Sequence, residues 1–397
     1  MMIPERPALE RRVLSILDGS AGSPRIPVVL GGCGSGRTSL LLRLRDLIGH
    51  DTCQFLDLER IATTPERCLA AIRAASPFPS HPYGRSEGAE PGAREAFDAS
   101  LALLDTARAS SGAPATFLLD EFLELRTFES FPGLRSVLRD LIAALASSGN
   151  RFVLTTRYTA RALRLLRDAP PQFEIIHVAP LTAAEVRTTL PGLAESKSAP
   201  NAFREAEEDR ARDDLARLVQ ALADGRPSYA RLITEAAVDG TRSTSDPVSA
   251  LTALLSPTGN LAATCRFSYE LRLHRARGYG ALKAILDVLA QEEPLTLTEI
   301  ALRLHRTPGS TKDYLSWLED VDLITARQKR YSFTDPMMRL WVRLHCRAVP
   351  PGDEDIAREV HTYVTSRLPQ PEPALALAGP RPAEEVPSKS WGIIEID

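Results

Sequence analysis

A glycine-rich loop near the start of the chain has the residue types that bind phosphate. The apolar run from Ile26 to Leu30 ends in glycines, and a helical pattern follows from Thr38 to Ile48. Glycines let a backbone adopt positive φ angles around an anion, and the N–H groups at a helix N-terminus attract that anion. We therefore expect a phosphate-binding loop, and its expected contact residues are Gly31, Gly32, Gly34, Ser35, Gly36, Arg37, Thr38 and Ser39.

This loop matches the Walker A pattern G-x-x-x-x-G-K-[ST], except that Arg37 stands at the lysine position. Lysine carries a compact charge on a flexible stem, whereas arginine presents a broader planar fork. The chain contains few lysines, so a general preference for arginine also explains the exchange. We predict that Arg37 neutralises phosphate and that the Thr38 hydroxyl is a Mg²⁺ ligand. The pattern favours nucleotide binding and leaves hydrolysis open.

Two acidic residues follow a second buried strand. The unbroken apolar run from Ala115 to Leu119 is typical of a buried parallel strand, and it ends in Asp120 and Glu121. Ligands of α/β sheets bind at the carboxyl ends of the strands. Such an ending also occurs where a strand simply runs into a loop, but its distance from the glycine-rich loop favours a Walker B motif. Asp120 is then expected to hold Mg²⁺, and Glu121 to orient or deprotonate the attacking water.

A third strand-like run, beginning at Arg151, ends in the polar residues Thr155, Thr156 and Arg157. A hydroxyl or a guanidinium at this position would detect the γ-phosphate or position a water molecule. We therefore add Thr156 and Arg157 to the expected site. A plain strand end with a solvated arginine is the alternative interpretation, and the residues themselves do not decide between the two.

Strand and helix patterns alternate through residues 1–181. The strand-like runs cover 26–30, 54–58, 115–121, 151–157 and 173–178, and helical patterns precede and separate them. This alternation predicts an α/β fold with a parallel sheet. Residues 182–277 are helical and include a long amphipathic helix over 202–223 and a further stretch over 247–277.

The C-terminal part begins with a different pattern. Residues 278–349 contain three helical segments (281–291, 297–304 and 310–319) and a hairpin pattern over 323–333, which together predict a winged helix-turn-helix. Residues 350–367 predict one last helix. Residues 368–397 are rich in proline, alanine and glutamate and predict a disordered tail. Its apolar end, 391–397, is expected either to dock on a protein partner or to fold back on the chain.

The two Walker motifs, the Thr155-Thr156-Arg157 strand end and the turn Gly225-Arg226-Pro227 together resemble the STAND/AAA+-like P-loop ATPases. Within them the chain looks most like the archaeal-type ATPases, over about residues 5 to 345. The resemblance implies an ASCE-type P-loop sheet, a helical lid, a C-terminal winged helix, and ATP with Mg²⁺ as ligands. In such a lid the Gly-x-Pro turn approaches the nucleotide, which makes Pro227 an expected site residue.

DNA is a candidate partner for residues 297–331. The third helix of the predicted winged helix offers Lys312 but also several acidic residues, and acidic side chains repel phosphate. The basic residues of the hairpin, Arg327, Lys329 and Arg330, are able to contact a DNA backbone. A protein-contact or intramolecular role is at least as compatible with these residues.

Composition excludes few classes of protein. The 397 residues carry 48 lysines and arginines against 51 acidic residues, and the net charge of −3 gives no general attraction to nucleic acid or anionic membranes. The five cysteines are scattered, which is typical of reduced thiols, and we expect a cytoplasmic protein without a membrane segment. Cys33, within the glycine-rich loop, is interpreted as a small filler rather than a redox centre.

Three functions stay open at this point. The first is a Mg²⁺-dependent ATPase that acts as a nucleotide-driven switch, with oligomers allowed and Arg126, Arg135 and Arg139 available to reach a neighbour's nucleotide. The second is a DNA-binding regulator whose loop binds nucleotide with little hydrolysis. The third is an interaction scaffold in a signalling or defence complex, which docks through its tail.

Overall fold

The structure is a computed structural model that describes residues 6–19, 25–79, 91–190, 202–238, 246–276 and 278–368. Within these ranges five strands form one parallel sheet in the order β2-β3-β4-β1-β5. Their bounds are Ile26–Leu30 (β1), Cys53–Asp57 (β2), Thr116–Asp120 (β3), Arg151–Thr156 (β4) and Phe173–His177 (β5). Because β4 lies between β3 and β1, the glycine-rich loop after β1 and the acidic end of β3 are separated by the polar end of one central strand.

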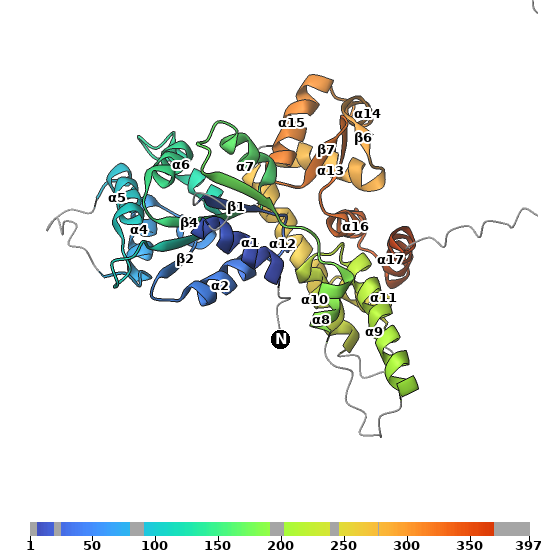
Figure 1. Cartoon of the computed structure of the whole chain (residues 1–397). Coiled ribbons are helices and arrows are strands. Elements are labelled where there is room, and N and C mark those ends of the chain that lie inside the picture. The colour runs from blue at the N-terminus through green and yellow to red at the C-terminus, as the bar shows by residue number, and fades with distance from the viewer. Residues whose placement is uncertain are drawn as a thin grey trace, which may run out of the picture.

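Helices cover both faces of this sheet, since alternate residues of a strand point to opposite faces. Val29, Leu118 and Val153 pack toward α1 (Pro7–Asp18) and α2 (Arg37–Ile48). On the opposite face, β-strand residues such as Phe117 and Phe152 stack with ring centroids 5.7 Å apart. That face is covered by α4 (Pro65–Ala74), α5 (Ala93–Thr106) and α6 (Val137–Ser147). The result is a three-layer core (Figure 1).

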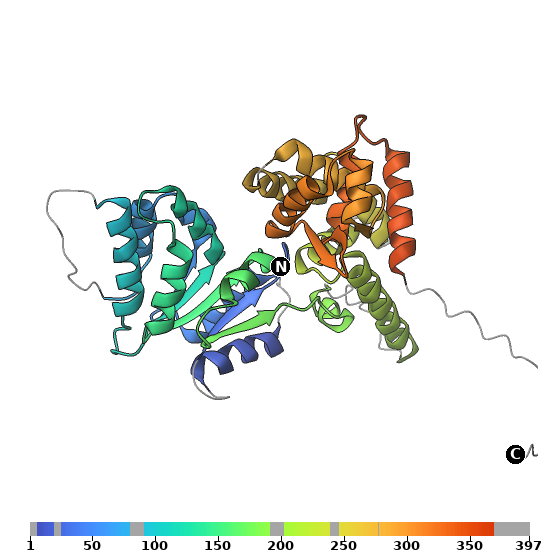
Figure 2. The same cartoon turned by 90° about the horizontal axis from the view of Figure 1, so that it is seen from above.

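The next helices lie beside the carboxyl end of the sheet. They are α8 (Ala183–Thr189), α9 (Ala202–Leu222), α10 (Pro227–Val238), α11 (Pro247–Leu254) and α12 (Asn260–Arg275). Figure 2 shows the core on one side and these helices, with the C-terminal elements, on the other. Tyr229 and Ile233 of α10, and Leu261 and Tyr269 of α12, are buried in the same hydrophobic cluster as one face of the sheet. The hydrophobic core of the sheet therefore continues without a break into these helices.

The C-terminal part contains helices and a small antiparallel sheet in the order β6-β8-β7. The elements are α13 (Tyr279–Gln291), β6 (Leu295–Thr296), α14 (Leu297–Arg303), α15 (Pro308–Asp320), β7 (Ile324–Arg327), β8 (Arg330–Phe333), α16 (Pro336–His345) and α17 (Asp353–Arg367). Three helices and a hairpin thus follow the predicted order, and β6 was not predicted. The interpretation as a winged helix stays a prediction. The predicted tail lies outside the described residues from 369 onward.

The structure corrects one other expectation and adds an element that was not predicted. The helical stretch predicted over 247–277 is interrupted, because α11 ends at Leu254 and α12 begins only at Asn260, after Pro257 and Gly259. The segment after the acidic strand end forms a 3₁₀ helix, η1 (Phe122–Ser130), that the sequence pattern did not show. Its residues Phe122, Leu123 and Phe128 are buried, so η1 closes the core beside β3.

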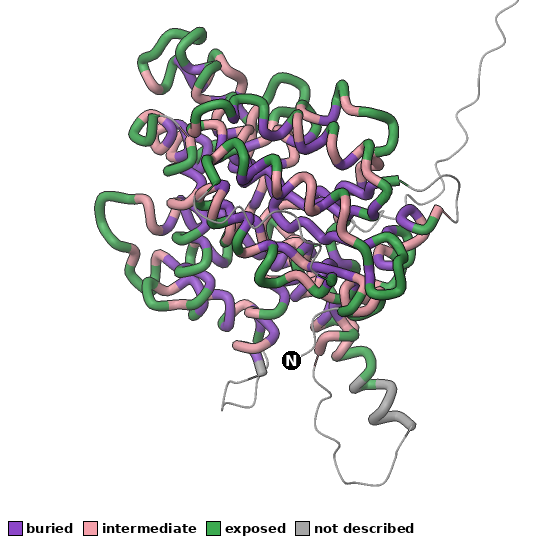
Figure 3. Tube along the Cα trace, turned by 90° about the vertical axis from the view of Figure 1, so that its left-hand side faces the viewer, coloured by how far each residue is buried: buried purple, intermediate pink, exposed green. Residues whose placement is uncertain are grey.

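Burial is concentrated in the strands and the inward faces of the helices, as the purple segments of Figure 3 show, whereas many of the outer turns are exposed. Among the described residues, no helix is both long and apolar enough to cross a membrane. The predicted parallel α/β sheet is confirmed, and β4 lies between the two strands, β1 and β3, that carry the Walker motifs.

Candidate nucleotide site

The glycine-rich loop follows β1 directly and ends where α2 begins, at Arg37. Gly34 and Gly36 have φ angles of 75° and 88°, which side chains rarely adopt. A side chain on Gly34 would also collide with Ser228 of α10, and one on Gly36 would lie 3.5 Å from the Pro227 ring. Glycine is therefore favoured at both positions by the backbone, and at Gly34 also by the close approach of Ser228.

The predicted Mg²⁺ ligands lie together. The Thr38 hydroxyl, in the first turn of α2, donates to Oδ2 of Asp120 at the end of β3, at 2.6 Å. The second oxygen, Oδ1, accepts a hydrogen bond from the Thr155 hydroxyl of β4. Asp120 is buried, so both hydroxyls hold its carboxylate in one orientation next to the loop. Thr155 was not among the predicted contact residues, although it belongs to the same polar strand end as Thr156 and Arg157, which were predicted.

Glu121 is enclosed by two arginines. Its Oε1 accepts from Arg37 Nη2 at 2.6 Å and from Arg157 Nε at 3.0 Å. Its Oε2 accepts from the Arg157 backbone N–H at 3.0 Å and from the Thr156 hydroxyl at 3.3 Å. Burial raises the pKa of Glu121, but the charges of Arg37 and Arg157 outweigh it and lower the pKa overall. The carboxylate is therefore ionised and held in place by both arginines.

Arg37 lies across the base of the loop. Its Nη1 donates to the Gly32 carbonyl at 2.6 Å and to the Ser35 hydroxyl at 3.2 Å, while Nη2 reaches Glu121. The two ends of this planar fork are thus engaged within the protein, in a way that a single ammonium could not reproduce. The predicted contact of Arg37 with phosphate stays a prediction. The same holds for Arg157, whose Nη2 pairs with Glu59.

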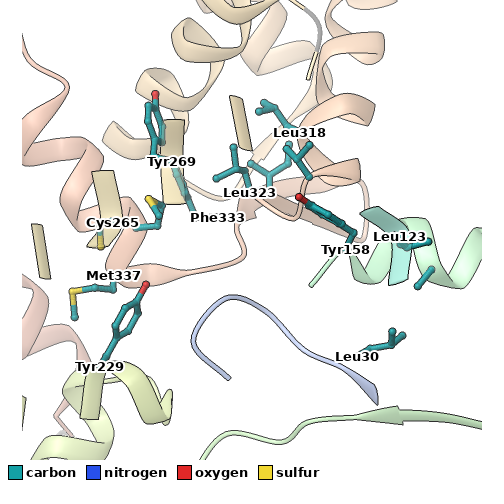
Figure 4. Packing of buried hydrophobic residues seen from close by; sticks show 14 of the residues in the cluster. Leu30, Leu123, Tyr158, Tyr229, Cys265, Tyr269, Leu318, Leu323, Phe333 and Met337 are labelled. Carbon is teal, nitrogen blue, oxygen red and sulfur yellow. The ribbon is translucent and has the colours of Figure 1, made fainter. Parts of the chain in front are cut away.

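The helices beside the sheet cover the loop. Figure 4 shows the loop that follows Leu30 with Tyr229 of α10 to its left and with Phe333 and Tyr158 above it. Ser228 N–H donates to the Gly34 carbonyl at 3.2 Å, and Arg226 Nη1 donates to the Cys33 carbonyl at 2.8 Å. The predicted approach of Pro227 to the loop is thus present in the geometry. Its contact with a nucleotide stays a prediction.

Arg226 also links the loop to the C-terminal part. Its Nη2 donates to the Thr334 carbonyl at 3.0 Å, and its Nε lies 3.7 Å from Asp335 Oδ1. Asp335 caps α16 and accepts a 2.7 Å hydrogen bond from the buried Tyr229 hydroxyl. A single residue of the turn Gly225-Arg226-Pro227 therefore contacts both the phosphate-binding loop and the segment that follows β8.

We expect the Tyr229→Phe variant to lose about 1–2 kcal/mol of unfolding free energy, because a buried hydrogen bond to a carboxylate is removed. Urea unfolding followed by circular dichroism measures this loss. Tyr331→Phe is the matched control, since burial and the charge of Glu319 act on the Tyr331 hydroxyl but no side-chain hydrogen bond to it is found within the described part of the chain. Equal losses in both variants would contradict this assignment.

Several buried donors around the loop lack partners. Arg37 Nε, Arg272 Nε and Nη2, and the Ser228 hydroxyl make no hydrogen bond to any described residue. Arg272 of α12 is 1% exposed, and its charge, with that of Arg157, lowers the pKa of the Cys33 thiol although burial opposes the shift. Each unsatisfied buried donor costs about 1–3 kcal/mol. Phosphate oxygens are acceptors that would satisfy such donors, so the residues present fit a nucleotide phosphate chain, and Thr38 with Asp120 fit a Mg²⁺ ion.

Sequence reasoning missed Arg226, Arg272 and Asp322 as neighbours of the loop. Arg226 was visible in the turn next to Pro227, whereas Arg272 gave no local signal within an ordinary helix. The predicted contacts of Arg126, Arg135 and Arg139 with a neighbour's nucleotide stay predictions. Arg126 pairs with Glu129 at 3.4 Å on the surface of η1.

No protein-family model and no curated protein matches the chain. Among solved structures it is similar to a Walker-type ATPase of Pyrococcus abyssi, with 17% identity, a TM-score of 0.58, and coverage of 85% of this chain and 95% of that one. It also matches the Aeropyrum pernix ORC1 protein in complex with DNA (17% identity, TM-score 0.41, coverage 92% and 95%). A third match is a STAND protein with a tetratricopeptide repeat sensor from Pyrococcus horikoshii (16% identity, TM-score 0.34, coverage 90% and 44%).

Only the first of these matches is close enough to show a shared fold; the other two have TM-scores below 0.5. The strand order, the loop after β1 and the acidic end of β3 define the P-loop NTPase class of fold. More narrowly, the chain has the fold of a Walker-type ATPase. The predicted resemblance is thereby confirmed at the level of fold.

Proposed function

We propose that this protein binds ATP with Mg²⁺ at the loop of residues 31–39 and acts as a nucleotide-driven switch. The observation that carries the proposal is the 2.6 Å contact between the Thr38 hydroxyl and the Asp120 carboxylate. It brings the two predicted Mg²⁺ ligands, which are 82 residues apart, to one point beside the glycine-rich loop. The ion, when bound, supplies charge that offsets the phosphates.

The contacts of Arg226 support the switch part of the proposal. An anion in the loop would compete with the Cys33 and Gly34 carbonyl contacts that now hold the start of α10. Because Arg226 also holds the Thr334 carbonyl, a shift of α10 would be transmitted to α16 and β8. A local change of charge at a loop that biases the packing of neighbouring elements is the general basis of nucleotide switches.

The C-terminal part fits an intramolecular role better than a DNA-binding one. Asp320, at the end of α15, pairs with Arg161 and Arg164 of α7 (Thr159–Leu166) in the core. The helix that would read DNA in a winged helix thus has one end held on the core. We therefore propose that residues 278–349 form a winged helix that reports the state of the nucleotide site to the rest of the chain.

Hydrolysis in this arrangement is expected to be slow, because Glu121 is paired with both Arg37 and Arg157. The Arg37→Lys variant keeps the positive charge but cannot bridge the Gly32 carbonyl and Glu121 at once. We expect it to bind ATP and to raise steady-state phosphate release at least about 3-fold, since one of the two clamps on Glu121 is loosened.

Phosphate release and binding of a fluorescent ATP analogue, measured on the wild type and on Arg37→Lys, test this function. Saturable, Mg²⁺-dependent binding by both proteins supports it. Arg43→Lys, on an exposed part of α2, controls for a general effect of the exchange. Unchanged turnover in Arg37→Lys would contradict the proposed clamp, and absence of binding in both proteins would contradict the function itself.

A further inference from the structure

The carboxylate of Asp322, which follows α15 and Val321, points at the phosphate-binding loop. Asp322 has a φ of 56°, in the left-handed region where glycine is favoured, and it is 8% exposed. Its Oδ2 lies 3.4 Å from the position that a Cβ on Gly32 would occupy. The same position is 2.8 Å from Arg226 Nη1, so Asp322 and Arg226 approach one side of the loop together.

Basic groups surround this carboxylate. Burial raises the pKa of Asp322 to about 6, and Asp335 adds to this shift, whereas the charges of Arg272, Arg226 and Arg37 oppose it, so the carboxylate is mostly ionised at neutral pH. Yet Oδ2 makes no hydrogen bond with any described residue. The carboxylate therefore lies among arginines that surround the loop, and its Oδ2 neither caps a helix nor stabilises a turn.

The contact between α12 and the residues that follow α15 does not depend on this side chain. Arg272 Nη1 donates to the backbone carbonyl of Asp322 at 2.7 Å, and that contact stays when the side chain is changed. A residue that only ended α15 would be least strained as glycine, since a non-glycine residue in the left-handed region costs free energy. Ending α15 therefore does not explain why an acidic side chain stands at position 322. Its position beside Arg226 and Gly32 suggests a role at the loop.

We propose that the Asp322 carboxylate is a built-in competitor of the nucleotide phosphates, which must displace it from the arginines beside Gly32 and Cys33. The proposal rests on the nucleotide binding proposed above and adds a residue that opposes it. Two anions that share one group of arginines repel each other strongly where water is excluded. Entry of a phosphate is thereby coupled to movement of the end of α15 away from the loop.

The test is the dissociation constant for ATP with Mg²⁺ and for adenosine, measured by calorimetry on the full chain. Asp322→Asn keeps the size of the side chain, tolerates the left-handed backbone and removes the charge. We expect it to bind ATP at least about 10-fold more tightly than the wild type, with no change for adenosine, which has no phosphate. Asp322→Gly, which also relieves the backbone, provides a second variant with the same expected gain.

Asp320→Asn is the matched control. It removes a carboxylate two residues earlier that joins α15 to α7 and not to the loop. If it gains ATP affinity equally, loosening of α15 explains the gain and the competitor is refuted. Equal ATP affinity in the wild type and both Asp322 variants also refutes it, as does an equal gain for adenosine. If none of the proteins binds ATP, the proposed function fails as well, which is a different result from binding without a gain.

Discussion

The Glu121→Gln variant is expected to bind ATP as the wild type does and to hydrolyse it at least about 100-fold more slowly. Glu121 is the buried, ionised carboxylate at the end of the strand that carries Asp120, and its pKa is held low by Arg37 and Arg157. Glutamine retains an oxygen that accepts from the Arg157 backbone N–H, so the local structure is kept. It lacks the basic oxygen that would accept a proton from water.

Steady-state phosphate release, beside binding of a fluorescent ATP analogue, measures this effect. Glu124→Gln is the control, because Glu124 lies one turn further along η1 and pairs with Arg275. Its turnover should stay close to that of the wild type. Hydrolysis by Glu121→Gln at the wild-type rate would show that another group activates the water.

The Asp120→Asn variant is expected to lose the contribution of Mg²⁺ to nucleotide affinity. In the structure the Thr38 and Thr155 hydroxyls both donate to Asp120. Both donors are neutral, so they do not neutralise the carboxylate, and its negative charge can attract a cation beside the loop. Asparagine removes that charge, and carboxylates are the ligands that Mg²⁺ prefers. The dissociation constant for ATP with Mg²⁺ should rise at least about 10-fold and approach the value measured in EDTA.

Titration of ATP with Mg²⁺ and with EDTA separates this effect from simple loss of the fold. Thr38→Ser is the control, since serine keeps the hydroxyl that contacts Asp120. We expect it to retain most of the Mg²⁺ dependence. A variant Asp120→Asn that still gains affinity from Mg²⁺ would place the ion elsewhere.

Local patterns were sufficient to predict the sheet and the loop. Buried parallel strands are continuous apolar runs, and all five strands were predicted within about two residues of their bounds. Two features escaped because they depend on context. The 3₁₀ helix η1 has no strict helical period, and the break between α11 and α12 lies within one otherwise helical pattern.

In the candidate site, too, some features follow from local sequence and others depend on the folded context. The glycine-rich loop, Asp120 and Glu121 are adjacent in sequence to the strands that position them, so their meeting could be predicted. The pairing of Glu121 with Arg37 and Arg157 could not, because it depends on side-chain geometry. Arg272 and Asp322 lie more than 200 residues from the loop in the sequence. They approach it only because α12 and the C-terminal part pack against the core.

Calorimetric titration of the wild-type chain with ATP, in the presence of Mg²⁺ and then of EDTA, tests the central claim most directly. We expect one saturable site per chain, with a dissociation constant below about 1 mM and tighter binding when Mg²⁺ is present. Binding that is absent under both conditions, or that is the same with and without Mg²⁺, would contradict a nucleotide site built from the loop and Asp120.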